Sequence, residues 1–363
     1  MARPSRPPSP CGAQPVNPLL AIEGLTVRFH LRDAVVEAVT DLDLTVRPGE
    51  LLAVVGESGC GKSVLAHALL GLLPANTTVT GRALLGAVDV PGAADPSGAV
   101  DPSEAVDPSE VVGPPGVGGP SGVVGPSRAV DLLGCGERTL ARQIRGRRVG
   151  LIPQSPATAL TAVRKGRRLL AETLKAHGRD PGLADRVALE AGLDPAALER
   201  YPFELSGGMA QRLATALALA TEPPLLIADE PTSGLDRPLV DHTLDLLRRR
   251  CDDGAAVLLI THDLAAAERV ADTVAVMYAG RIVEHRPADD LFRAPGHPYT
   301  RGLRNALPNR EFRAIAGHPP MLTALPEGCA FAPRCDRVSE ACATQPAGPV
   351  ACHHPLTTAE VLA

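Results

Sequence analysis

Strand-like patterns of apolar residues recur along most of the chain. Leu19 to Phe29 and Val35 to Val46 alternate apolar with polar positions, which predicts strands with one buried face. Shorter runs that are apolar throughout predict strands buried on both faces. They are Leu51 to Val55, Val149 to Ile152, Leu225 to Ala228 and Ala256 to Ile260. Thr273 to Tyr278 and Arg281 to Glu284 flank Ala279-Gly280, a sequence typical of a hairpin.

Segments with helical character lie between these strands. Residues 63–73 predict a helix that stops before Pro74, and residues 166–200 predict a series of interrupted helices. Ser206 is a good N-cap for a helix that reaches about Ala220. Strands that alternate with helices predict an α/β fold, in which a parallel sheet is covered on both faces. Functional residues are expected at the carboxyl ends of the strands of such a sheet.

Two stretches do not fit a packed domain. Residues 1–17 are rich in proline and predict a disordered tail. Residues 89–130 divide into seven six-residue units, from DVPGAA to GPSRAV, which indicates a tandem expansion within one loop. Parallel β-helices also have six-residue repeats, but here proline in every unit would remove ladder donors and few apolar residues could form a core. We therefore expect a disordered, partly polyproline-like insert without a catalytic role.

Composition excludes several classes of protein. The net charge of −5 and the aromatic content of 2%, with no Trp, argue against a nucleic-acid partner. No run reaches the roughly 18 apolar residues of a membrane span, and the start lacks the apolar core of a signal peptide. These features predict a soluble, cytoplasmic protein. Four of its eight cysteines fall between residues 329 and 352, a cluster that in the cytosol favours metal binding over disulfides.

The first candidate site is a glycine-rich loop between an apolar strand and a helix. The loop runs Gly56-Glu57-Ser58-Gly59-Cys60-Gly61-Lys62-Ser63 and fits the pattern G-x-x-x-x-G-K-[ST]. Its glycines let backbone N–H groups turn toward phosphate oxygens, and the helix points its positive end the same way. Lys62 supplies a charge for the β- and γ-phosphates, and Ser63 offers a hydroxyl to Mg²⁺. The loop therefore predicts a nucleotide site.

Cys60 lies at the start of the helix that follows this loop. At such a position a thiol can have a lowered pKa and be sensitive to oxidation. The alternative is that Cys60 is simply a small residue that the loop tolerates.

Two acids follow the apolar run from Leu225 to Ala228. Asp229, at the end of that strand, can hold Mg²⁺ directly or through water. Glu230 can reach the far side of the γ-phosphate, where a carboxylate polarises the attacking water. The same pattern fits an ordinary strand end, and it points to catalysis because a phosphate loop precedes it in the chain.

A serine and two glycines separate this chain from other phosphate-loop proteins. They belong to the run Leu205-Ser206-Gly207-Gly208-Met209 and can expose helix N–H groups as a second anion site. The run resembles the signature loop of the ATP-binding subunits of ABC transporters. That resemblance implies a P-loop NTPase of the ABC ATPase type over residues 18–295, with an antiparallel β subdomain and an α-helical subdomain. It also implies that two such domains dimerise head to tail, so that Ser206, Gly207 and Gly208 of one grip the γ-phosphate on the other.

The same resemblance implies roles for further residues. Gln154 resembles the loop glutamine that senses Mg²⁺ and the transport partner, and His262 resembles the switch histidine that contacts the γ-phosphate. Asp236 lies in a run, Ser233-Gly234-Leu235-Asp236, that resembles the loop crossing the dimer interface. Phe29 stands where the family has an aromatic residue that stacks on adenine, although a strand phenylalanine that faces the core fits the sequence as well.

A composition shift after Pro295 marks residues 296–363 as a small, Cys-rich C-terminal extension. Its runs His297-Pro298-Tyr299-Thr300-Arg301-Gly302-Leu303 and Gly328-Cys329-Ala330-Phe331-Ala332-Pro333-Arg334-Cys335 resemble the extension of dipeptide and oligopeptide importers. Four thiolates in so short a segment can be stapled by an Fe–S cluster or by zinc, and zinc fits poorly because no C-x2-C is present. The resemblance implies a [4Fe–4S] cluster on Cys329, Cys335, Cys342 and Cys352. Cysteines without metal, or a ligand role for His353 or His354, remain alternatives.

Taken with the resemblance, these features predict the ATPase subunit of a peptide-type ABC importer that uses ATP and Mg²⁺. The expected partners are a second ATPase subunit, identical or different, two membrane permease subunits and, indirectly, a solute-binding protein. The expected location is the cytoplasmic face of the cell membrane. Import of nickel or another solute is the nearest alternative. A soluble ABC ATPase acting on ribosomes or DNA, or a regulatory protein with a degenerate site, is a more distant one.

Overall fold

The computed structural model describes residues 17–86 and 129–362. The predicted tail (1–17) and the predicted repeat insert (89–130) lie almost entirely outside these residues, so both predictions stay untested. One end of the insert is an exception. Val130 belongs to a strand, so the boundary predicted there is wrong by at least one residue.

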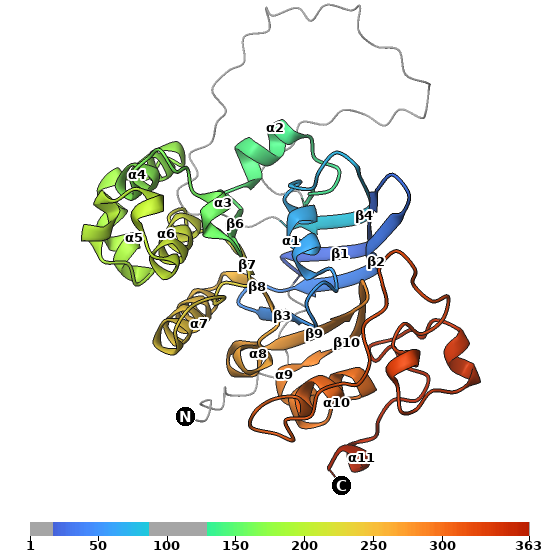
Figure 1. Cartoon of the computed structure of the whole chain (residues 1–363). Coiled ribbons are helices and arrows are strands. Elements are labelled where there is room, and N and C mark those ends of the chain that lie inside the picture. Colours follow the sequence, from blue (N-terminus) through green and yellow to red (C-terminus); the bar gives the residue numbers. More distant parts are fainter. Residues whose placement is uncertain (1–16, 87–128, 363) are drawn as a thin grey trace, which may run out of the picture.

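The described residues form ten strands, eleven α-helices and six short 3₁₀ or π segments. Figure 1 shows their arrangement. The strands are β1 (Leu20–His30), β2 (Val35–Val46), β3 (Leu51–Val55), β4 (Thr77–Leu85), β5 (Val130–Asp131), β6 (Val149–Ile152), β7 (Leu225–Asp229), β8 (Ala256–Thr261), β9 (Thr273–Tyr278) and β10 (Arg281–Pro287). The helices are α1 (Lys62–Leu69), α2 (Glu137–Thr139), α3 (Pro156–Ala159), α4 (Gly166–Ala176), α5 (Ala184–Glu190), α6 (Gly207–Leu219), α7 (Arg237–Asp252), α8 (Leu264–Val270), α9 (Ala288–Arg293), α10 (Pro298–Asn305) and α11 (Thr358–Leu362).

A six-stranded sheet forms the centre of the protein. Its strand order is β10-β9-β3-β8-β7-β6, and every neighbouring pair except β9 with β10 is parallel. The β9–β10 pair is the predicted hairpin. Ala279 and Gly280 at its turn both have positive φ, as tight two-residue turns of this kind require. The predicted parallel sheet is therefore confirmed.

Both faces of this sheet are buried, and the side chains of each strand alternate between the two faces. Leu52 and Val54 of β3 pack in one core with α1 and the strands of a second sheet. Leu51, Ala53 and Val55 pack in another core with α7, α8 and α9. This explains why β3 reads as a continuous apolar run in the sequence.

The second sheet is antiparallel, with the strand order β2-β1-β4-β5. It contains the two predicted alternating strands and adds β4 and β5, which the sequence pattern did not identify. In the register of β4 with β5, Leu85 pairs with Val130. The chain therefore leaves this sheet and returns to it at neighbouring positions, a geometry in which the length of the intervening segment has little energetic effect on the fold.

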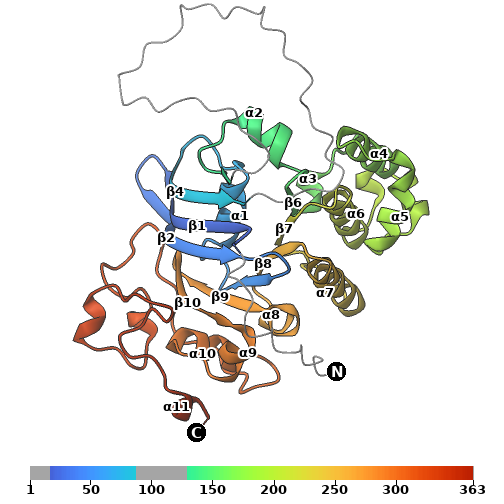
Figure 2. The ribbon, with the colours of Figure 1, turned by 180° about the vertical axis from the view of Figure 1, so that it is seen from behind.

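A helical subdomain (α3 to α6) lies beside β6, the edge strand of the central sheet (Figures 1 and 2). It has its own core, which includes Leu170, Leu198 and Leu213. The predicted N-cap is confirmed, since the Ser206 side chain accepts a hydrogen bond from Met209 N–H. The predicted end of the first helix is wrong. Helix α1 stops at Leu69, four residues early, where Gly71 takes a positive φ and turns the chain.

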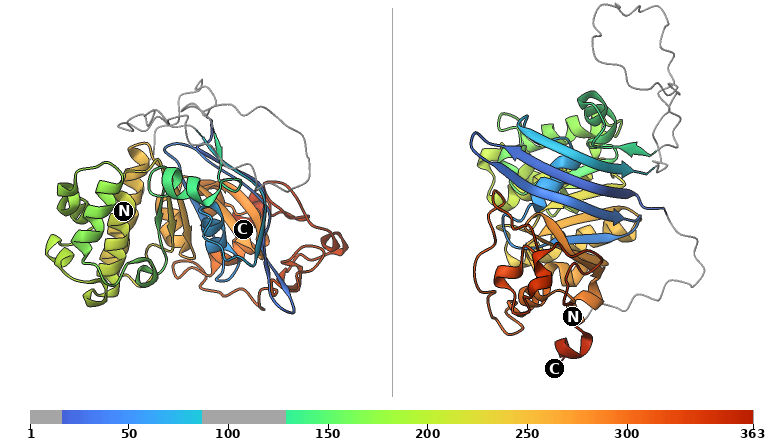
Figure 3. Two further views of the ribbon diagram at one scale, coloured as in Figure 1. Left: turned by 90° about the horizontal axis from the view of Figure 1, so that it is seen from above. Right: turned by 90° about the vertical axis from the view of Figure 1, so that its right-hand side faces the viewer.

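The C-terminal extension packs beside β2 and β10 (Figure 3). Backbone hydrogen bonds link His285 N to Pro349 O and Ala351 N to Val283 O, and they tie the extension to β10. Tyr299 and Phe331 of the extension lie in the same core as Tyr278 of β9. The extension and the ATPase core are therefore joined by shared packing.

Across residues 17–86 and 129–362, no helix combines the length and the apolar character needed to cross a membrane.

Candidate functional site

The predicted nucleotide residues follow the carboxyl ends of adjacent parallel strands. The phosphate loop follows β3, the Thr261-His262 pair ends β8, and Asp229-Glu230 ends β7. The register aligns these ends, because Val55 pairs with Thr261 and Asp229 pairs with Ile260. The three motifs consequently meet at one edge of the sheet, as expected for an open α/β fold.

The Lys62 side chain holds the phosphate loop in shape. Its Nζ donates to the carbonyl oxygens of Gly56 at 2.8 Å and Glu57 at 2.9 Å, and the residue is 6% exposed. Gly61 has φ of +106°, and a Cβ there would lie 2.1 Å from the carbonyl oxygen of Ala38. The close backbone approach that a phosphate cradle needs is therefore available only to glycine at this position.

Ser63 and Asp229, the two predicted magnesium ligands, lie next to each other. The hydroxyl of Ser63 donates to Asp229 Oδ1 at 2.9 Å. Burial raises the pKa of Asp229 above its usual value, and the hydrogen bond from Ser63 opposes that rise. A hydroxyl and a carboxylate side by side are the oxygen ligands that Mg²⁺ prefers, so the geometry fits the ion.

Glu230 and His262 are in direct contact. His262 Nδ1 donates to Glu230 Oε2 at 2.8 Å, and the Thr261 hydroxyl lies 3.5 Å from the same oxygen. The carboxylate is buried, whereas the histidine side chain is 64% exposed. The backbone of Glu230 has φ of +48°, which is uncommon for a residue other than glycine. The carboxylate is thus held by hydrogen bonds on its buried side, and the exposed histidine ring lies next to it.

Burial, rather than the helix terminus, controls the Cys60 thiol. Cys60 is 6% exposed, and burial raises its pKa even though the nearby Lys62 acts in the opposite direction. The hypothesis of a lowered pKa is therefore wrong, because it considered the helix end and left out desolvation.

Slow alkylation is the expected consequence for Cys60. At pH 7.5 iodoacetamide should modify it more slowly than an unperturbed thiol, because less of it is thiolate, and the rate should keep rising above pH 9. Peptide mapping by mass spectrometry at several pH values measures the rate at this site, with a Cys-containing model peptide as the reference. Alkylation that is already complete and independent of pH near 7 would contradict this assignment.

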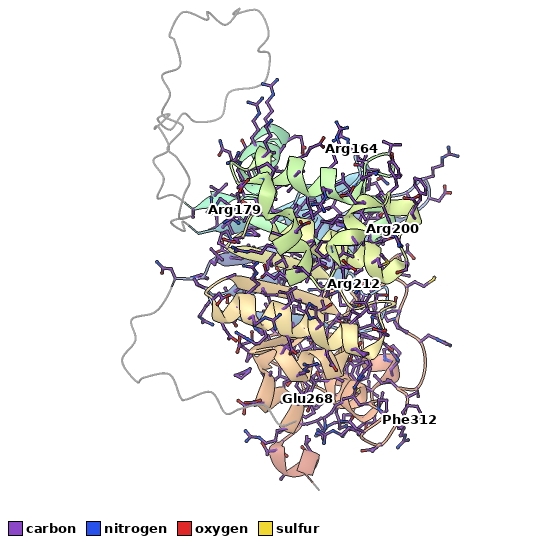
Figure 4. The ribbon with its side chains drawn as sticks, turned by 90° about the vertical axis from the view of Figure 1, so that its left-hand side faces the viewer. Arg164, Arg179, Arg200, Arg212, Glu268 and Phe312 are labelled. Carbon is purple, nitrogen blue, oxygen red and sulfur yellow. The ribbon has the colours of Figure 1, made fainter. Side chains whose placement is uncertain are left out.

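The signature residues lie apart from the phosphate loop of their own chain. Ser206 and Gly207 are exposed at the start of α6, and β6 separates that helix from α1 in both Figure 1 and Figure 2. Arg212, labelled in Figure 4, donates to the carbonyl oxygens of Gly208 at 3.0 Å and Gly192 at 2.9 Å. The signature turn is therefore braced within the helical subdomain and presented to the outside.

The other predicted site residues have individual positions around this edge. Gln154 is exposed just after β6, and the carbonyl of the preceding residue accepts a hydrogen bond from Gln211 of α6 at 3.1 Å. Asp236 caps α7 by accepting from Leu239 N at 3.2 Å. Phe29 is half-buried and packs against the core beneath β1, which leaves both of its predicted roles open.

The four cysteines of the extension are close enough to interact electrostatically. Burial is the main cause of the raised pKa of Cys329, Cys335 and Cys352, and repulsion between neighbouring thiolates adds to it. The backbone N–H groups of Arg337 and His354 donate to Cys335 Sγ and Cys352 Sγ, each at 3.3 Å. Among the described residues, no three His, Cys, Asp or Glu side chains are grouped tightly enough to hold a metal as they stand. The described thiols are therefore not arranged as a metal site in this structure.

Sequence reasoning missed one set of contacts to the phosphate loop. Arg334 and Tyr299, both from the extension, bond to Glu57. No local pattern could have identified them, because the partners lie more than 240 positions apart in the chain.

Comparison with known proteins supplies the family. The family described as "ABC transporter" matches residues 39–92 and 132–233, with most of the repeats between the two matched stretches. The family described as "Oligopeptide/dipeptide transporter, C-terminal region" matches residues 283–342. A Brucella melitensis protein named for peptide import and ATP binding is 37% identical over 361 residues, covering 93% of this chain and 95% of the relative. The chain belongs to the ABC transporter ATP-binding proteins.

Two further comparisons agree with this assignment. The oligopeptide transport ATP-binding protein OppD of Haemophilus influenzae is 37% identical over 344 residues, covering 91% of this chain and 93% of the relative. The ATP-binding cassette MJ0796, solved as a dimer with ADP and Pi, has a TM-score of 0.57 at 19% identity and covers 74% of this chain and 98% of that chain. At that identity the likeness concerns the fold alone, and it confirms the predicted ABC ATPase fold.

The family assignment selects among the alternatives left open by the sequence. An ABC transporter ATP-binding protein hydrolyses ATP, with Mg²⁺, and couples that reaction to transport. It works as a dimeric ATPase with membrane permease partners. The prediction of a transport ATPase is thereby confirmed over a ribosome- or DNA-directed ATPase and over a degenerate regulator.

Proposed function

We propose that this chain powers the import of peptides through a separate membrane permease, from the cytoplasmic face of the membrane. The observation that carries the proposal is that its C-terminal extension, and not the ATPase core alone, matches the oligopeptide/dipeptide transporter family. Relatives named for oligopeptide transport align over nine-tenths of the chain. We take residues 18–295 as the ATPase domain and 296–363 as the extension.

Within this ATPase the site residues divide the work as follows. Lys62 and the loop N–H groups would bind the β- and γ-phosphates. Ser63, Asp229 and Gln154 would hold Mg²⁺, which would supply positive charge beside the phosphates. Glu230 accepts the proton of the attacking water. His262 orients that carboxylate, as their 2.8 Å contact supports, and the surrounding burial keeps bulk water from competing.

The proposed complete site contains two chains. Ser206, Gly207 and Gly208 of one ATPase subunit would cover the γ-phosphate held by Lys62 of the other, with Asp236 at the crossing between them. The exposure of Ser206 and Gly207 supports this, since N–H donors at a helix start are otherwise left to solvent. The second subunit is either a copy of this chain or a related ATPase.

We also propose a [4Fe–4S] cluster on the four cysteines of the extension, with the thiolates moving together to bind it. The residues are Cys329, Cys335, Cys342 and Cys352. Protein purified without oxygen should be brown, absorb near 400 nm and contain about four irons per chain. Colourless, iron-free protein with four titratable thiols in the extension would refute the cluster.

Transport in proteoliposomes tests the substrate. The chain is reconstituted with its permease and binding protein, and uptake of radiolabelled tri- to pentapeptides and of labelled nickel is followed with and without ATP. ATP-dependent peptide uptake that stops in the Glu230→Gln protein supports the proposal. ATP-dependent uptake of nickel without peptide uptake would overturn it in favour of the metal-import alternative.

A further inference from the structure

The C-terminal extension reaches into the phosphate loop through a single arginine. Arg334 ends the short turn Ala332–Arg334, and its guanidinium bonds both carboxylate oxygens of Glu57, Nη1 to Oε2 at 2.7 Å and Nη2 to Oε1 at 3.0 Å. Its Nε donates to Ala316 O at 2.9 Å. The side chain of Arg334 is only 3% exposed. The Glu57 side chain is 29% exposed, so the pair is buried on the arginine side alone. A two-pronged pair of this kind is among the more directional ion pairs in proteins.

An aromatic cluster fixes the arginine in that position. Tyr278, Tyr299 and Phe331 pack together, with ring centroids 4.5 Å apart for the two tyrosines and 5.4 Å between Phe331 and each tyrosine. The Arg334 guanidinium lies 5.7 Å from the ring centroid of Tyr278 and also donates to its hydroxyl at 3.3 Å. The rotamer of the arginine is therefore held by packing as well as by charge.

Glu57 is held from three directions. Its backbone N–H donates to the Tyr299 hydroxyl at 3.0 Å, its carbonyl accepts from Lys62 Nζ at 2.9 Å, and its carboxylate meets Arg334. Two of these three contacts come from the extension. Glu57 lies between glycines that leave the rest of the loop free to change shape, so these contacts limit the conformations that the loop can sample.

We propose that Arg334 is a positioning residue for nucleotide binding: it holds Glu57 so that the phosphate loop is already in its binding shape before ATP arrives. The extension then contributes to ATP affinity although it touches no phosphate. A loop that is ordered in advance pays less conformational entropy on binding. ATP itself orders the loop once it is bound. The loss of Arg334 should therefore weaken the affinity for ATP and leave the rate of hydrolysis of bound ATP nearly unchanged.

Binding of Mg²⁺ with a non-hydrolysable ATP analogue to the full chain tests the proposal. Arg334→Met should weaken binding about five- to tenfold, the range given by the net contribution of one typical hydrogen bond, because the arginine acts on the phosphate loop and not on the phosphate itself. Turnover at saturating ATP should change less than about twofold. Arg334→Lys should fall between wild type and Arg334→Met, since lysine keeps the charge and loses the fork. A purely structural role would lower the melting temperature without this split between affinity and turnover.

Arg337→Met is the matched control. Arg337 lies in the same segment and pairs with Glu360 at 2.7 Å, away from the phosphate loop. Its affinity for the analogue should equal that of wild type. Equal weakening in the Arg334 and Arg337 variants, or wild-type affinity in a folded Arg334→Met protein, would overturn the proposal.

Glu57→Gln approaches the same contact from the loop side and keeps the test decisive should Arg334→Met fail to fold. It should weaken binding by a similar factor, and the double variant should be no weaker than either single one, because the two residues act through one contact. Unchanged affinity in Glu57→Gln, or losses that multiply in the double variant, would refute the role of Arg334.

Discussion

Replacing Glu230 by glutamine should leave ATP binding intact and lower turnover by about two to four orders of magnitude, the range for loss of a positioned general base. Glutamine keeps the volume of the buried side chain and can still meet His262, now 2.8 Å from Glu230 Oε2. It cannot accept the proton of the attacking water at neutral pH. The loss therefore falls on the chemical step and not on the fold.

Single-turnover hydrolysis of labelled ATP, beside equilibrium binding of the same nucleotide, measures the two effects separately. Glu222→Gln is a suitable control because Glu222 has nearly the same backbone conformation, with φ of +51°, and pairs with Arg179 in the helical part of the protein. It should hydrolyse ATP at the wild-type rate. Normal turnover in Glu230→Gln would remove Glu230 from the base role.

Replacing Lys62 by methionine should reduce ATP affinity by about a hundredfold or more. The amine is the cation placed inside the phosphate loop, and two charge-assisted hydrogen bonds to phosphate would be lost together, each worth about 1.5–3 kcal/mol. The loop itself would also loosen, since Nζ now bonds the carbonyl oxygens of Gly56 and Glu57. Methionine replaces the unbranched apolar stem of lysine and lacks only the terminal amine position, so the buried stem keeps most of its packing.

Isothermal titration with MgATP measures this loss. Lys175→Met is the control. Lys175 is exposed on α4, and its replacement removes the same charge from the chain. ATP affinity in the Lys175 variant should be unchanged. Affinity for ATP within a fewfold of wild type in Lys62→Met would mean that the loop N–H groups hold the phosphates without it.

The local motifs of the nucleotide site could be predicted because each depends on neighbours in sequence. The phosphate loop needs glycines at set places between a strand and a helix, and Asp229-Glu230 needs only a buried strand before it. Parallel pairing of β3, β8 and β7 then brings their carboxyl ends together, and parallel pairing follows from the alternation of strands and helices. Their convergence was therefore foreseeable without coordinates.

Strands with weak patterns could not be predicted in the same way. β4 contains a glycine and several exposed polar residues, and β5 has two residues, the first of which ends the last proline-rich repeat unit. Both become strands because β1 offers a free edge for pairing with β4, and β4 in turn pairs with β5. These two segments are therefore strands because of that tertiary pairing and not because of their local propensity.

By itself the sequence determined the fold class, the position of the phosphate loop, the place of Asp229 and Glu230 at a strand end and the resemblance to importer ATPases, because periodicity and motif spacing are local properties. Tertiary structure decided what depends on burial and on distant partners. It raised the pKa of Cys60, because desolvation is set by everything packed around a thiol. It also joined Arg334 to Glu57 across 277 positions, since only the folded chain brings the extension against the loop.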